Sequence, residues 1–352
     1  MTGLLPITGV VLGSGAPGEY DTNGDDFDML RDAVIAAGLD GTLNDPFASL
    51  TVFAPNDDAF VGLAQTLGYS GSDEAGSFAY IVDSLSLLGG GDAIPLLTEI
   101  LTYHVVDGAF DLNAVVGLGD GAEIGTLQGG NLTLDLGTPS LGDLDPGLPD
   151  PTLIGFDVMA TNGIIHVLDG VLLPLAVSDI LSQPGTDFVI AGDDDDRLKG
   201  GKGDDFLSGK DGEDRINGGK GDDVILGGND DDRLSGRQDD DILRGEDGDD
   251  VLRGNQGKDL LDGGLGDDTL VGNGGADVFV FSEGYCEDLI RTFQDGVDKI
   301  DVSGFGFTSF EEFEDAVSSR GQRTEIDFGD GDVLTISGVT AANLDASDFI
   351  FA

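Results

Sequence analysis

The chain has 352 residues and is strongly acidic, with 69 aspartates and glutamates against 16 lysines and arginines and a formal net charge of −53. Because no segment offers a phosphate-binding surface, nucleic acid is excluded as an expected partner. The single cysteine, Cys286, leaves no intrachain disulfide. No apolar run approaches the roughly 20 residues that span a bilayer, so no membrane insertion is expected.

Residues 1–26 are expected to form an N-terminal lead, and the hydrophobic residues among the first 20 are expected to make one strand. The lead lacks a basic region and is interrupted by glycine and proline, so a cleavable signal peptide is not expected. Four oxygen-bearing side chains in and just after it occupy places 1, 3, 5 and 12 of an EF-hand-like loop. They are Asp21, Asn23, Asp25 and Asp32.

Two features of this stretch favour a different interpretation. Asp26 stands at place 6, where an EF-hand-like loop requires glycine. From Phe27 the sequence FDMLRDAVIAAGL has the pattern of an amphipathic helix that ends at Gly38. The alternative is therefore that these acids lie at a helix N-terminus, where the helix dipole stabilises negative charge.

Three sequence blocks define the next domain, residues 27–181. LTVFAPNDDAF, from Leu50, predicts a buried strand, a proline turn and a helix capped by Asn56. PLLTEILTYHVVDGAF, from Pro95, predicts a helix that runs into a strand, and TNGIIHVLDGVLLP, from Thr161, is rich in strand-forming residues. In this order the blocks resemble the signature of the fasciclin domain. The resemblance implies an α/β (α+β) wedge, with a β-sandwich or barrel flanked by helices, and a role in adhesion between cells or to extracellular matrix.

His104 and His166 lie within these blocks, and we expect them to be buried side chains that bond backbone carbonyls. The chain has no HExxH zinc motif, no GxSxG nucleophile elbow and no GxxxxGK(S/T) phosphate loop. Pairs of carboxylates, as glycosidases use, carry no information in a chain with 69 acids. No catalytic residue and no enzyme activity are therefore predicted.

Residues 182–280 consist of eleven repeats of nine residues, such as GGKGDDFLS from Gly200 and GGLGDDTLV from Gly263. The eighth place is always apolar and the sixth is always aspartate. A solvated acidic tail, the alternative for so charged a stretch, gives no reason for an apolar residue at every ninth place. The sixth-place residues are Asp187, Asp196, Asp205, Asp214, Asp223, Asp232, Asp241, Asp250, Asp259, Asp268 and Asp277.

Glycine at places 1, 2 and 4 predicts a tight turn followed by a three-residue strand in which only the eighth residue points inward. Two units then form one coil, and coils stack at about 4.8 Å. Aspartates two units apart, such as Asp205 and Asp223, face each other along one edge and repel unless Ca²⁺, held by carboxylates and turn carbonyls, lies between them. The repeats resemble the repeats-in-toxin (RTX) calcium-binding β-roll. The resemblance implies several Ca²⁺ ions bound by the eleven aspartates.

Some units depart from the consensus. The first lacks its leading glycines and is expected to act as a cap, which makes Asp187 the weakest ligand candidate. The turns with a side chain at place 2 are expected to be looser. These place-2 residues are Lys210, Arg237, Glu246, Asn255 and Asn273.

The seventh place alternates between successive units. It is apolar in all odd units, from Phe188 to Val278, whereas the first even units have Arg197, Arg215 and Arg233. If alternate units form opposite sheets, one outer face is apolar and the other is basic at its start. The apolar face is then expected to be covered by another part of the chain or by a partner, unless it reflects only the residue preference of short strands.

Residues 281–352 predict strands, a short helix (SFEEFEDAVSSR), a β-hairpin and a terminal apolar strand. The segment resembles the cap that follows the repeats in serralysin-type secreted proteins. That resemblance implies an uncleaved signal for the type I secretion machinery, ending in an acid and hydrophobics as in Asp348–Phe351. Asp288, Asp298 and Asp301 are candidates for one more calcium site.

The predicted fold class is multidomain, with a fasciclin wedge, a calcium-stacked parallel β-roll and a β-rich C-terminal cap. The predicted function is that of an extracellular, calcium-binding adhesion or matrix protein whose roll folds on Ca²⁺ after type I export. Its partner would be an unidentified protein or polysaccharide of the cell surface or matrix. A structural surface-layer or biofilm component and a secreted hydrolase accessory are the alternatives.

Overall fold

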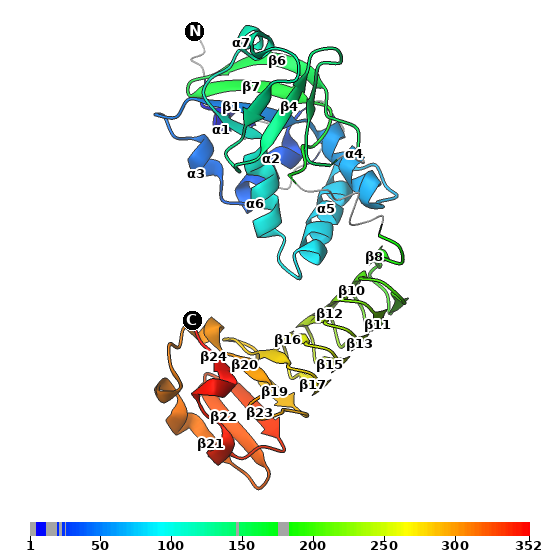
Figure 1. Cartoon of the computed structure of the whole chain (residues 1–352), viewed down its shortest axis with the longest axis vertical. Coiled ribbons are helices and arrows are strands. Elements are labelled where there is room, and N and C mark those ends of the chain that lie inside the picture. The colour runs from blue at the N-terminus through cyan, green and yellow to red at the C-terminus, as the bar shows by residue number, and fades with distance from the viewer. Residues whose placement is uncertain (1–4, 12–19, 21–22, 25, 146–147, 175–182) are drawn as a thin grey trace. The chain divides into compact units, whose positions relative to one another are not determined.

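The computed structural model describes the whole chain except residues 1–4, 12–19, 21–22, 25, 146–147 and 175–182. The chain divides into two compact units, Met1–Ile180 and Leu181–Ala352 (Figure 1). In the described part of the chain, no helix is both long and apolar enough to cross a membrane.

The first unit is built on a four-stranded sheet with the strand order β2-β1-β7-β6. β1 runs parallel to β7, and the other neighbouring pairs are antiparallel. β1 is buried at all six positions, which explains why its sequence is apolar except for Thr51 and does not alternate. The strands are β1 (Leu50–Pro55), β2 (Val105–Asp107), β6 (Leu153–Ala160) and β7 (Gly163–Leu168).

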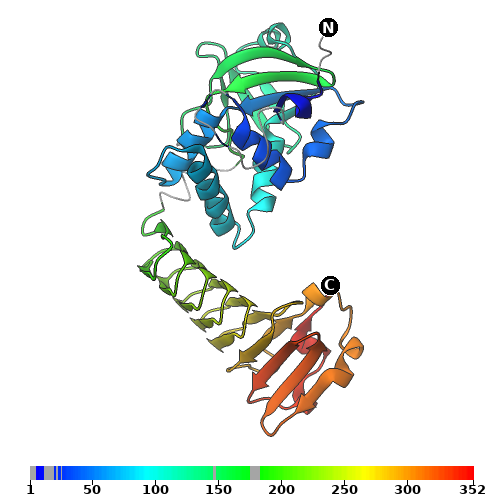
Figure 2. The same cartoon turned by 180° about the vertical axis from the view of Figure 1, so that it is seen from behind.

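A second, antiparallel sheet shares a core with the first. Phe53 of the large sheet and Leu132, Leu134 and Leu141 of the small one belong to a single buried cluster. Two sheets around one core, with helices beside them (Figure 2), are the architecture that the sequence predicts for this unit. The strands of the small sheet are β3 (Glu123–Gly125), β4 (Asn131–Asp135) and β5 (Ser140–Gly142), in that order.

Several helices of this unit begin at residues that the sequence marks as caps. The side chain of Asn56 accepts the N–H of Ala59 at the start of α4, as predicted, and Asp73 and Asp111 cap α5 and α7 in the same way. The helices are α1 (Ile7–Val11), α2 (Asp28–Ala36), α3 (Asp40–Leu43), α4 (Asp57–Leu67), α5 (Glu74–Leu88), α6 (Ile94–Tyr103) and α7 (Leu112–Leu118).

The strand predicted for the first 20 residues is wrong in its described part, because Ile7–Val11 forms the helix α1. Ile7 and Val11 stand four residues apart, so a helix places both on one face, and both are buried. The side chain of Asn162 accepts the N–H of Ile7 at 2.9 Å and fixes the start of this helix. A contact 155 residues away, which local pattern does not reveal, decides the conformation.

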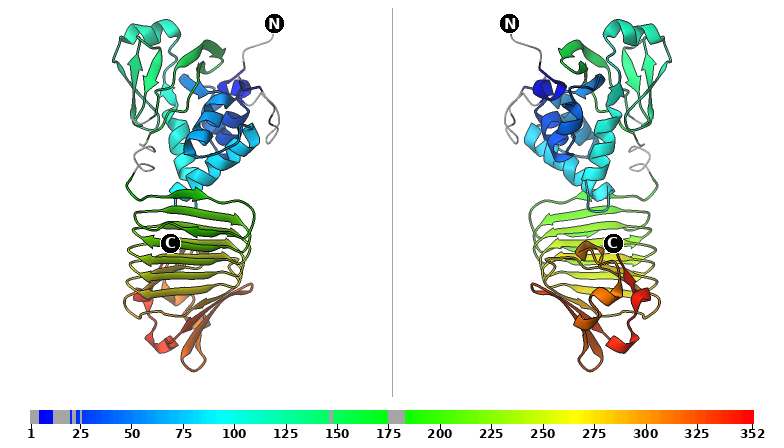
Figure 3. Two further views of the ribbon diagram at one scale, coloured as in Figure 1. Left: turned by 90° about the vertical axis from the view of Figure 1, so that its right-hand side faces the viewer. Right: turned by 90° about the vertical axis from the view of Figure 1, so that its left-hand side faces the viewer.

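The second unit begins with a stack of short strands that alternate between two parallel sheets (Figure 3). Odd units of the repeat supply one sheet, in the order β18-β16-β14-β12-β10-β8, and even units supply the other, β17-β15-β13-β11-β9. Neighbouring strands of a sheet pair in register eighteen residues apart, as Leu207 does with Ile225. Two units therefore make one coil, as the period predicts.

The inner strands have six residues where the repeat predicts three, because each strand continues through the first three places of the next unit. Place 8 forms the core, and from Leu207 to Phe279 these side chains are almost completely buried. The strands are β8 (Phe188–Ile190), β9 (Arg197–Lys199), β10 (Phe206–Asp211), β11 (Arg215–Lys220), β12 (Val224–Asn229), β13 (Arg233–Gln238), β14 (Ile242–Asp247), β15 (Val251–Gln256), β16 (Leu260–Leu265), β17 (Thr269–Gly274) and β18 (Val278–Val280).

Both sheets continue into the C-terminal cap. β20 and β24 extend the odd sheet, and β19, β23, β22 and β21 extend the even sheet. Ile300, Ile336 and Phe349 of the cap belong to the same buried cluster as the roll core, so the cap closes that end of the coil. The strands are β19 (Glu287–Ile290), β20 (Lys299–Asp301), β21 (Val317–Ser319), β22 (Arg323–Gly329), β23 (Asp332–Ser337) and β24 (Phe349–Ile350).

The hairpin predicted in the cap is present as β22 and β23, but the predicted short helix is replaced by two 3₁₀ turns and the strand β21. A 3₁₀ turn places residues three apart on one side, and Phe310 and Phe313 both pack against Phe349. The 3₁₀ turns of the cap are η2 (Ser303–Phe305), η3 (Phe310–Glu312), η4 (Glu314–Ala316), η5 (Ala341–Asn343) and η6 (Ala346–Asp348).

Candidate metal centre

The sixth-place aspartates form two rows along the roll, which we call ladders. Each aspartate directly precedes a strand in the sequence, and each sheet has one ladder. The backbone N–H of each aspartate donates to Oδ1 of the aspartate on the next coil, as Asp223 does to Asp241 at 3.0 Å. Across both ladders these distances run from 2.6 to 3.1 Å. One ladder joins Asp187, Asp205, Asp223, Asp241, Asp259 and Asp277, and the other joins Asp196, Asp214, Asp232, Asp250 and Asp268.

The second carboxylate oxygen, Oδ2, is buried and has no hydrogen-bond partner among the described residues. This holds for the nine sixth-place aspartates from Asp205 to Asp277. A buried charge without a partner is strongly destabilising, and native proteins pair it or coordinate it to a metal. The row of unpartnered oxygens therefore indicates a site for a positive charge on each coil.

The first-place glycines leave the space into which these oxygens point. A Cβ on Gly209 would lie 1.9 Å from Oδ2 of Asp214 and 2.6 Å from the carbonyl oxygen of Gly227. The same pair of oxygens, a carboxylate and a glycine carbonyl of the next coil, surrounds Gly245. No side chain fits there, and the two oxygen types are those that Ca²⁺ prefers.

Burial raises the pKa of the nine ladder carboxyls from Asp205 to Asp277, and neighbouring acids raise it further. The pKa rises to about 7 for Asp223 and to about 8 for Asp232 and Asp241. For Asp250 and Asp277 it rises to about 6. In each case desolvation is the largest cause, so the ionised ladder is unfavourable without a cation.

The two ends of the ladders differ. Asp187 is exposed and Asp196 partly exposed, because no coil precedes them. At the other end Asp288 and Asp298 continue the ladders by accepting the N–H groups of Asp268 and Asp277 at 3.0 and 3.1 Å. Asp301 does not join them, because its Oδ1 accepts the N–H of Ser303. Of the three acids that the sequence suggests for a further calcium site, two thus lie in the ladders.

The residues present fit a hard divalent cation, because they offer buried anionic oxygens beside backbone carbonyls and no soft ligand. Such a cation would supply the positive charge that the coils lack. The assignment of the eleven aspartates as ligands stays a prediction, with Asp187 as its weakest member.

The substituted turns keep the left-handed backbone of the consensus. At place 2, φ is 75° for Lys210, 77° for Glu246 and 96° for Arg237, against 124° for Gly228. The strands on both sides keep their register at these places. The expectation that these turns are looser stays a prediction. Left-handed backbone costs a residue with a side chain about 1 to 2 kcal/mol.

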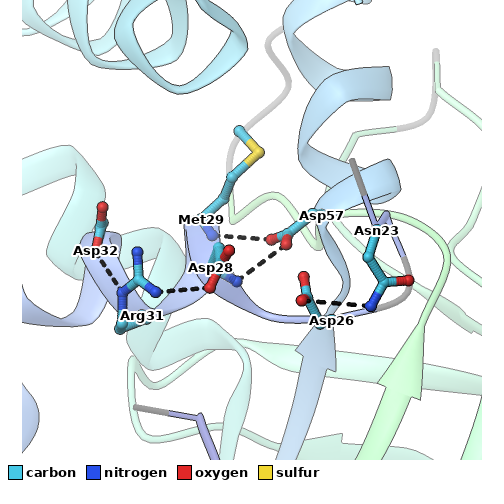
Figure 4. A network of polar contacts seen from close by, with 7 residues as sticks. All are labelled: Asn23, Asp26, Asp28, Met29, Arg31, Asp32 and Asp57. Atoms are coloured by element: carbon cyan, nitrogen blue, oxygen red, sulfur yellow. Dashed lines mark hydrogen bonds and ion pairs between the residues drawn. The ribbon is translucent and has the colours of Figure 1, made fainter. Parts of the chain in front are cut away.

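A second group of acids lies in the first unit, at the start of α2 (Figure 4). The carboxylate of Asp57 accepts the N–H groups of Asp28 and Met29 at 3.0 and 2.8 Å, while Arg31 pairs with Asp28 at 2.6 Å and with Asp32. Asp57 therefore caps α2 from another element. The role of Asp57 could not be predicted from the sequence, because Asp57 lies 29 positions after Asp28 and 28 positions after Met29.

Oxygens of Asp26, Asp28 and Asp57 lie within 4.8 Å of one another, a spacing compatible with a metal. Burial and a hydrogen bond to Asp26 raise the pKa of Asp57 to about 8. Asp57 also accepts two backbone N–H groups, and Asp28 pairs with Arg31. The arrangement matches the alternative in which acids stabilise a helix N-terminus. Asp21 and Asp25 of the EF-hand-like pattern lie outside the described residues, and Asn23 donates to Asp26.

Comparison with known families assigns the first unit and the repeats of the second. The family described as "Fasciclin domain" matches residues 25–174, and the family "RTX calcium-binding nonapeptide repeat (4 copies)" matches residues 183–215, 208–243 and 244–279. A Synechocystis relative, Protein sll1483, is 36% identical over 158 residues, which cover 44% of this chain and 72% of the relative. The chain belongs to the fasciclin family. C-terminal to its fasciclin domain, the chain has RTX repeats of the calcium-binding type.

Two further proteins show how far the similarity extends. The transforming growth factor-beta-induced protein ig-h3 of Sus scrofa is 32% identical over 151 residues, which are 43% of this chain and 18% of that protein. The solved AlgE6R2 subunit of the Azotobacter vinelandii mannuronan C5-epimerase is 36% identical, with 36% of this chain and 92% of that chain covered and a TM-score of 0.30. Each similarity covers less than half of the present chain.

Both histidines of the fasciclin domain are tied to the backbone. Nδ1 of His104 lies 2.8 Å from the carbonyl oxygen of Ile100, and its Nε2 accepts the N–H of Leu172 at 2.9 Å. Burial lowers the pKa of His104 to about 4, so its ring is neutral at physiological pH. Nε2 of His166 lies 2.8 Å from the carbonyl oxygen of Phe110. These contacts are the structural ones that the sequence analysis expects.

Proposed function

We propose that the protein is a secreted, calcium-binding adhesion or extracellular-matrix protein. Its fasciclin domain makes the contact, and its RTX roll folds on binding Ca²⁺ outside the cell. The observation that carries this proposal is the row of buried, unpartnered carboxylate oxygens in the same chain as an adhesion-type domain. The partner is a protein or polysaccharide of a cell surface or matrix, and neither nucleic acid nor a membrane interior is involved.

Calcium couples export to folding in this proposal. Where Ca²⁺ is scarce, repulsion along the ladders and the entropy of many glycines keep the repeats unfolded. Extracellular calcium modules bind with affinities of about 10⁻⁴ to 10⁻³ M, so Ca²⁺ outside the cell would neutralise the ladders and drive folding.

Residues 281–352 carry the proposed signal for the type I secretion machinery. In the folded cap Asp348 and Phe349 are buried, and Phe349 pairs with Ile300 of β20. A signal that includes them is accessible only before the cap folds. This supports export of an unfolded chain.

We propose no catalytic role. The ring nitrogens of both histidines are used in backbone contacts, and the ladder carboxylates are bound into the roll. Turnover by the purified protein on a panel of glycosides and esters would contradict this and would favour the hydrolase accessory.

Adhesion of the full chain to cells, to purified matrix proteins and to neutral polysaccharides tests the proposed function, at about 0.01 and 10 mM Ca²⁺ and in EDTA. We expect saturable binding that is lost when the fasciclin domain is unfolded by a core change such as Phe53→Ala and kept when the exposed Asp58 is changed to Asn. Calcium-dependent growth of regular sheets or fibres of the protein alone, without binding to cells, would favour the surface-layer or biofilm alternative.

A further inference from the structure

The outer face of the even sheet carries a groove of about 650 Å³ across β9, β11, β13 and β15. Six cationic side chains line this groove, and among the described residues no aspartate or glutamate does. All six are exposed. They form what we call the arginine face, namely Arg197, Lys199, Arg215, Arg233, Arg237 and Arg253.

The arginine face holds a large share of the few positively charged side chains of the chain. The chain has 16 lysines and arginines, and six of them lie here although the chain has 69 acids. Within the described residues, none of the six forms an ion pair, whereas Arg31, Arg244 and Arg320 do. The net charge of −53 therefore conceals a cationic surface whose charges are not neutralised within the chain.

The arginines repeat with the coil. Arg215 pairs in register with Arg197 on one side and with Arg233 on the other. Neighbouring strands lie about 4.8 Å apart, and like charges directly opposite one another in a sheet are destabilising. The row of arginines therefore destabilises the sheet, and an anionic ligand would relieve the repulsion.

The fold does not require arginine at these places. The equivalent positions of the odd sheet are apolar, as in Phe206 and Val224, and the later strands of the even sheet have Val251 and Thr269. The odd side chains are half-buried by one another along their ladder, and whether a partner covers them stays a prediction. Strand formation is thus satisfied without cations, so the arginine face has a separate role.

The ligand that fits is a linear polyanion with acid groups at regular intervals. Guanidinium groups bind carboxylate and sulfate through paired N–H donors. Asn217, Ser235 and Asn255 line the groove between the cations and offer amide and hydroxyl groups for sugar hydroxyls. No aromatic residue lines it, so the stacking that holds single-stranded nucleic acid is absent from the described lining.

We propose that the arginine face binds an acidic polysaccharide along the stacking direction of the coils. This goes beyond the proposed adhesive role of the fasciclin domain, because the roll makes a second and chemically defined contact. The spacing of the arginines depends on the stacked coils, so binding requires the folded roll. A field of the opposite sign surrounds the face, so only a ligand that reaches several cations at once is held.

Titration of the full chain in saturating Ca²⁺ with a fluorescently labelled heparin-type decasaccharide tests the proposal. The test variant is Arg197→Gln, Arg215→Gln and Arg233→Gln together. The matched control, Lys202→Gln, Lys220→Gln and Lys258→Gln, removes the same charge from exposed positions of the roll that do not line the groove. Calcium-induced circular dichroism of each variant reports whether the roll still folds.

We expect saturable binding of the decasaccharide, a loss of affinity of about tenfold or more in the arginine variant, and less than about a twofold loss in the control. Binding should weaken steeply with salt, and neutral dextran of equal length should not bind. The triple Arg→Lys variant should bind with intermediate affinity, because it keeps the charge and loses the paired donors.

Equal losses in the two triple variants, or an unchanged affinity in a folded arginine variant, would overturn the proposal. Tighter binding of poly-dT than of the decasaccharide would overturn it in favour of a nucleic-acid surface. Binding in EDTA by a roll that circular dichroism shows to be folded would contradict calcium-dependent folding and leave the arginine face supported. Binding in EDTA by an unfolded roll would overturn the proposal. The failure of this inference and the failure of the proposed function are therefore distinguishable.

Discussion

Asp241 illustrates what one residue does in the roll. Its N–H donates to Asp259, its Oδ1 accepts the N–H of Asp223, and its Oδ2 is buried beside Gly236 without a partner. The residue is thus both a hydrogen-bonded link between three coils and a carboxylate that calls for a cation. A change at this position can separate the two roles, because asparagine keeps the shape and the acceptor and loses the charge.

Asp241→Asn is expected to lower the apparent calcium affinity of the roll by about tenfold, or about 1.4 kcal/mol. The reason is that an anionic ligand becomes a neutral one while the ladder geometry is kept. Calcium titration followed by far-UV circular dichroism measures the change. Asp240→Asn serves as the control, because Asp240 is exposed on the adjacent place. Equal effects of the two changes would mean that only overall charge matters.

The raised pKa values predict that protons replace calcium. A carboxyl whose folded pKa lies above its unfolded value of 3.8 stabilises the fold when protonated, and this stability is lost as pH rises through the folded value. The folded values are about 6 for Asp259, about 8 for Asp241 and about 9 for Asp288. In EDTA we therefore expect β-structure near pH 4 that disappears between about pH 6 and 9.

Circular dichroism of the chain in EDTA across this pH range checks the prediction. Added Ca²⁺ should restore the signal at pH 8 and have little effect at pH 4. A metal-free roll that is more stable at pH 8 than at pH 4 would show that the ladder carboxyls are not held in a buried, unpaired state.

Asp57→Ala is expected to destabilise the fasciclin domain by about 2 kcal/mol, because the N–H groups of Asp28 and Met29 would lose their acceptor in a buried place. Asp58→Ala is the control, since Asp58 occupies the same first turn of α4 but is exposed. Urea unfolding followed by circular dichroism measures both. A similar loss in the two variants would mean that the first-turn charge of α4 matters and the cap on α2 does not.

At the scale of elements, each strand of the roll has one inward side chain with a large share of the packing. Leu243 of β14 is fully buried, whereas Leu260, which opens β16 at place 7, is half-buried on the outer face. Because each coil contacts only its neighbours, a defect at one place-8 position weakens two interfaces. The loss of stability on shortening a side chain should therefore depend mainly on the place of that side chain in the repeat, and hardly on which apolar residue stands there.

Leu243→Ala is expected to destabilise the calcium-loaded roll by about 2 to 5 kcal/mol, because it leaves a cavity in a column with no room to collapse. Leu260→Ala removes the same atoms from the outer face and should have less than half of that effect. Urea unfolding in saturating Ca²⁺ compares the two. Equal losses would indicate that the odd face is covered in solution, as the apolar pattern at place 7 suggests.

At the scale of the whole molecule, the chain consists of two units that differ in what holds them together. The fasciclin domain has a mixed core of sheets and helices and capped helix ends. The roll has a single column of apolar side chains between two rows of buried carboxylates. We therefore expect only the stability of the second unit to depend on a cation.

Removal of calcium is therefore expected to abolish one of two thermal transitions. In saturating Ca²⁺ the chain should show a transition for each unit, and in EDTA at neutral pH only that of the fasciclin domain. Differential scanning calorimetry measures both, and Mg²⁺ should restore the roll poorly, because it holds its own water and demands a stricter geometry. Two unchanged transitions in EDTA would contradict calcium-driven folding.

The sequence by itself determined the repeat, its inward and outward places and the aspartate row, because a strict period of nine leaves few ways to stack a chain. It also predicted the helix capped by Asn56 and the strand before it, since caps and apolar runs are local signals. It did not predict the length of the strands in the roll, because that length depends on pairing with the next coil.

Only the tertiary structure decided the rest. The helix α1 is held by Asn162, and the cap on α2 comes from Asp57, both distant in sequence. The structure places Asp288 and Asp298 in the ladders and leaves Asp301 out. The sequence does not reveal this, because the spacing of acids beyond the repeats is irregular. It also gathered six cations on one face, including Arg253 and Lys199, which stand at another place of the repeat. Periodicity fixes which residues recur, whereas packing fixes which of them meet.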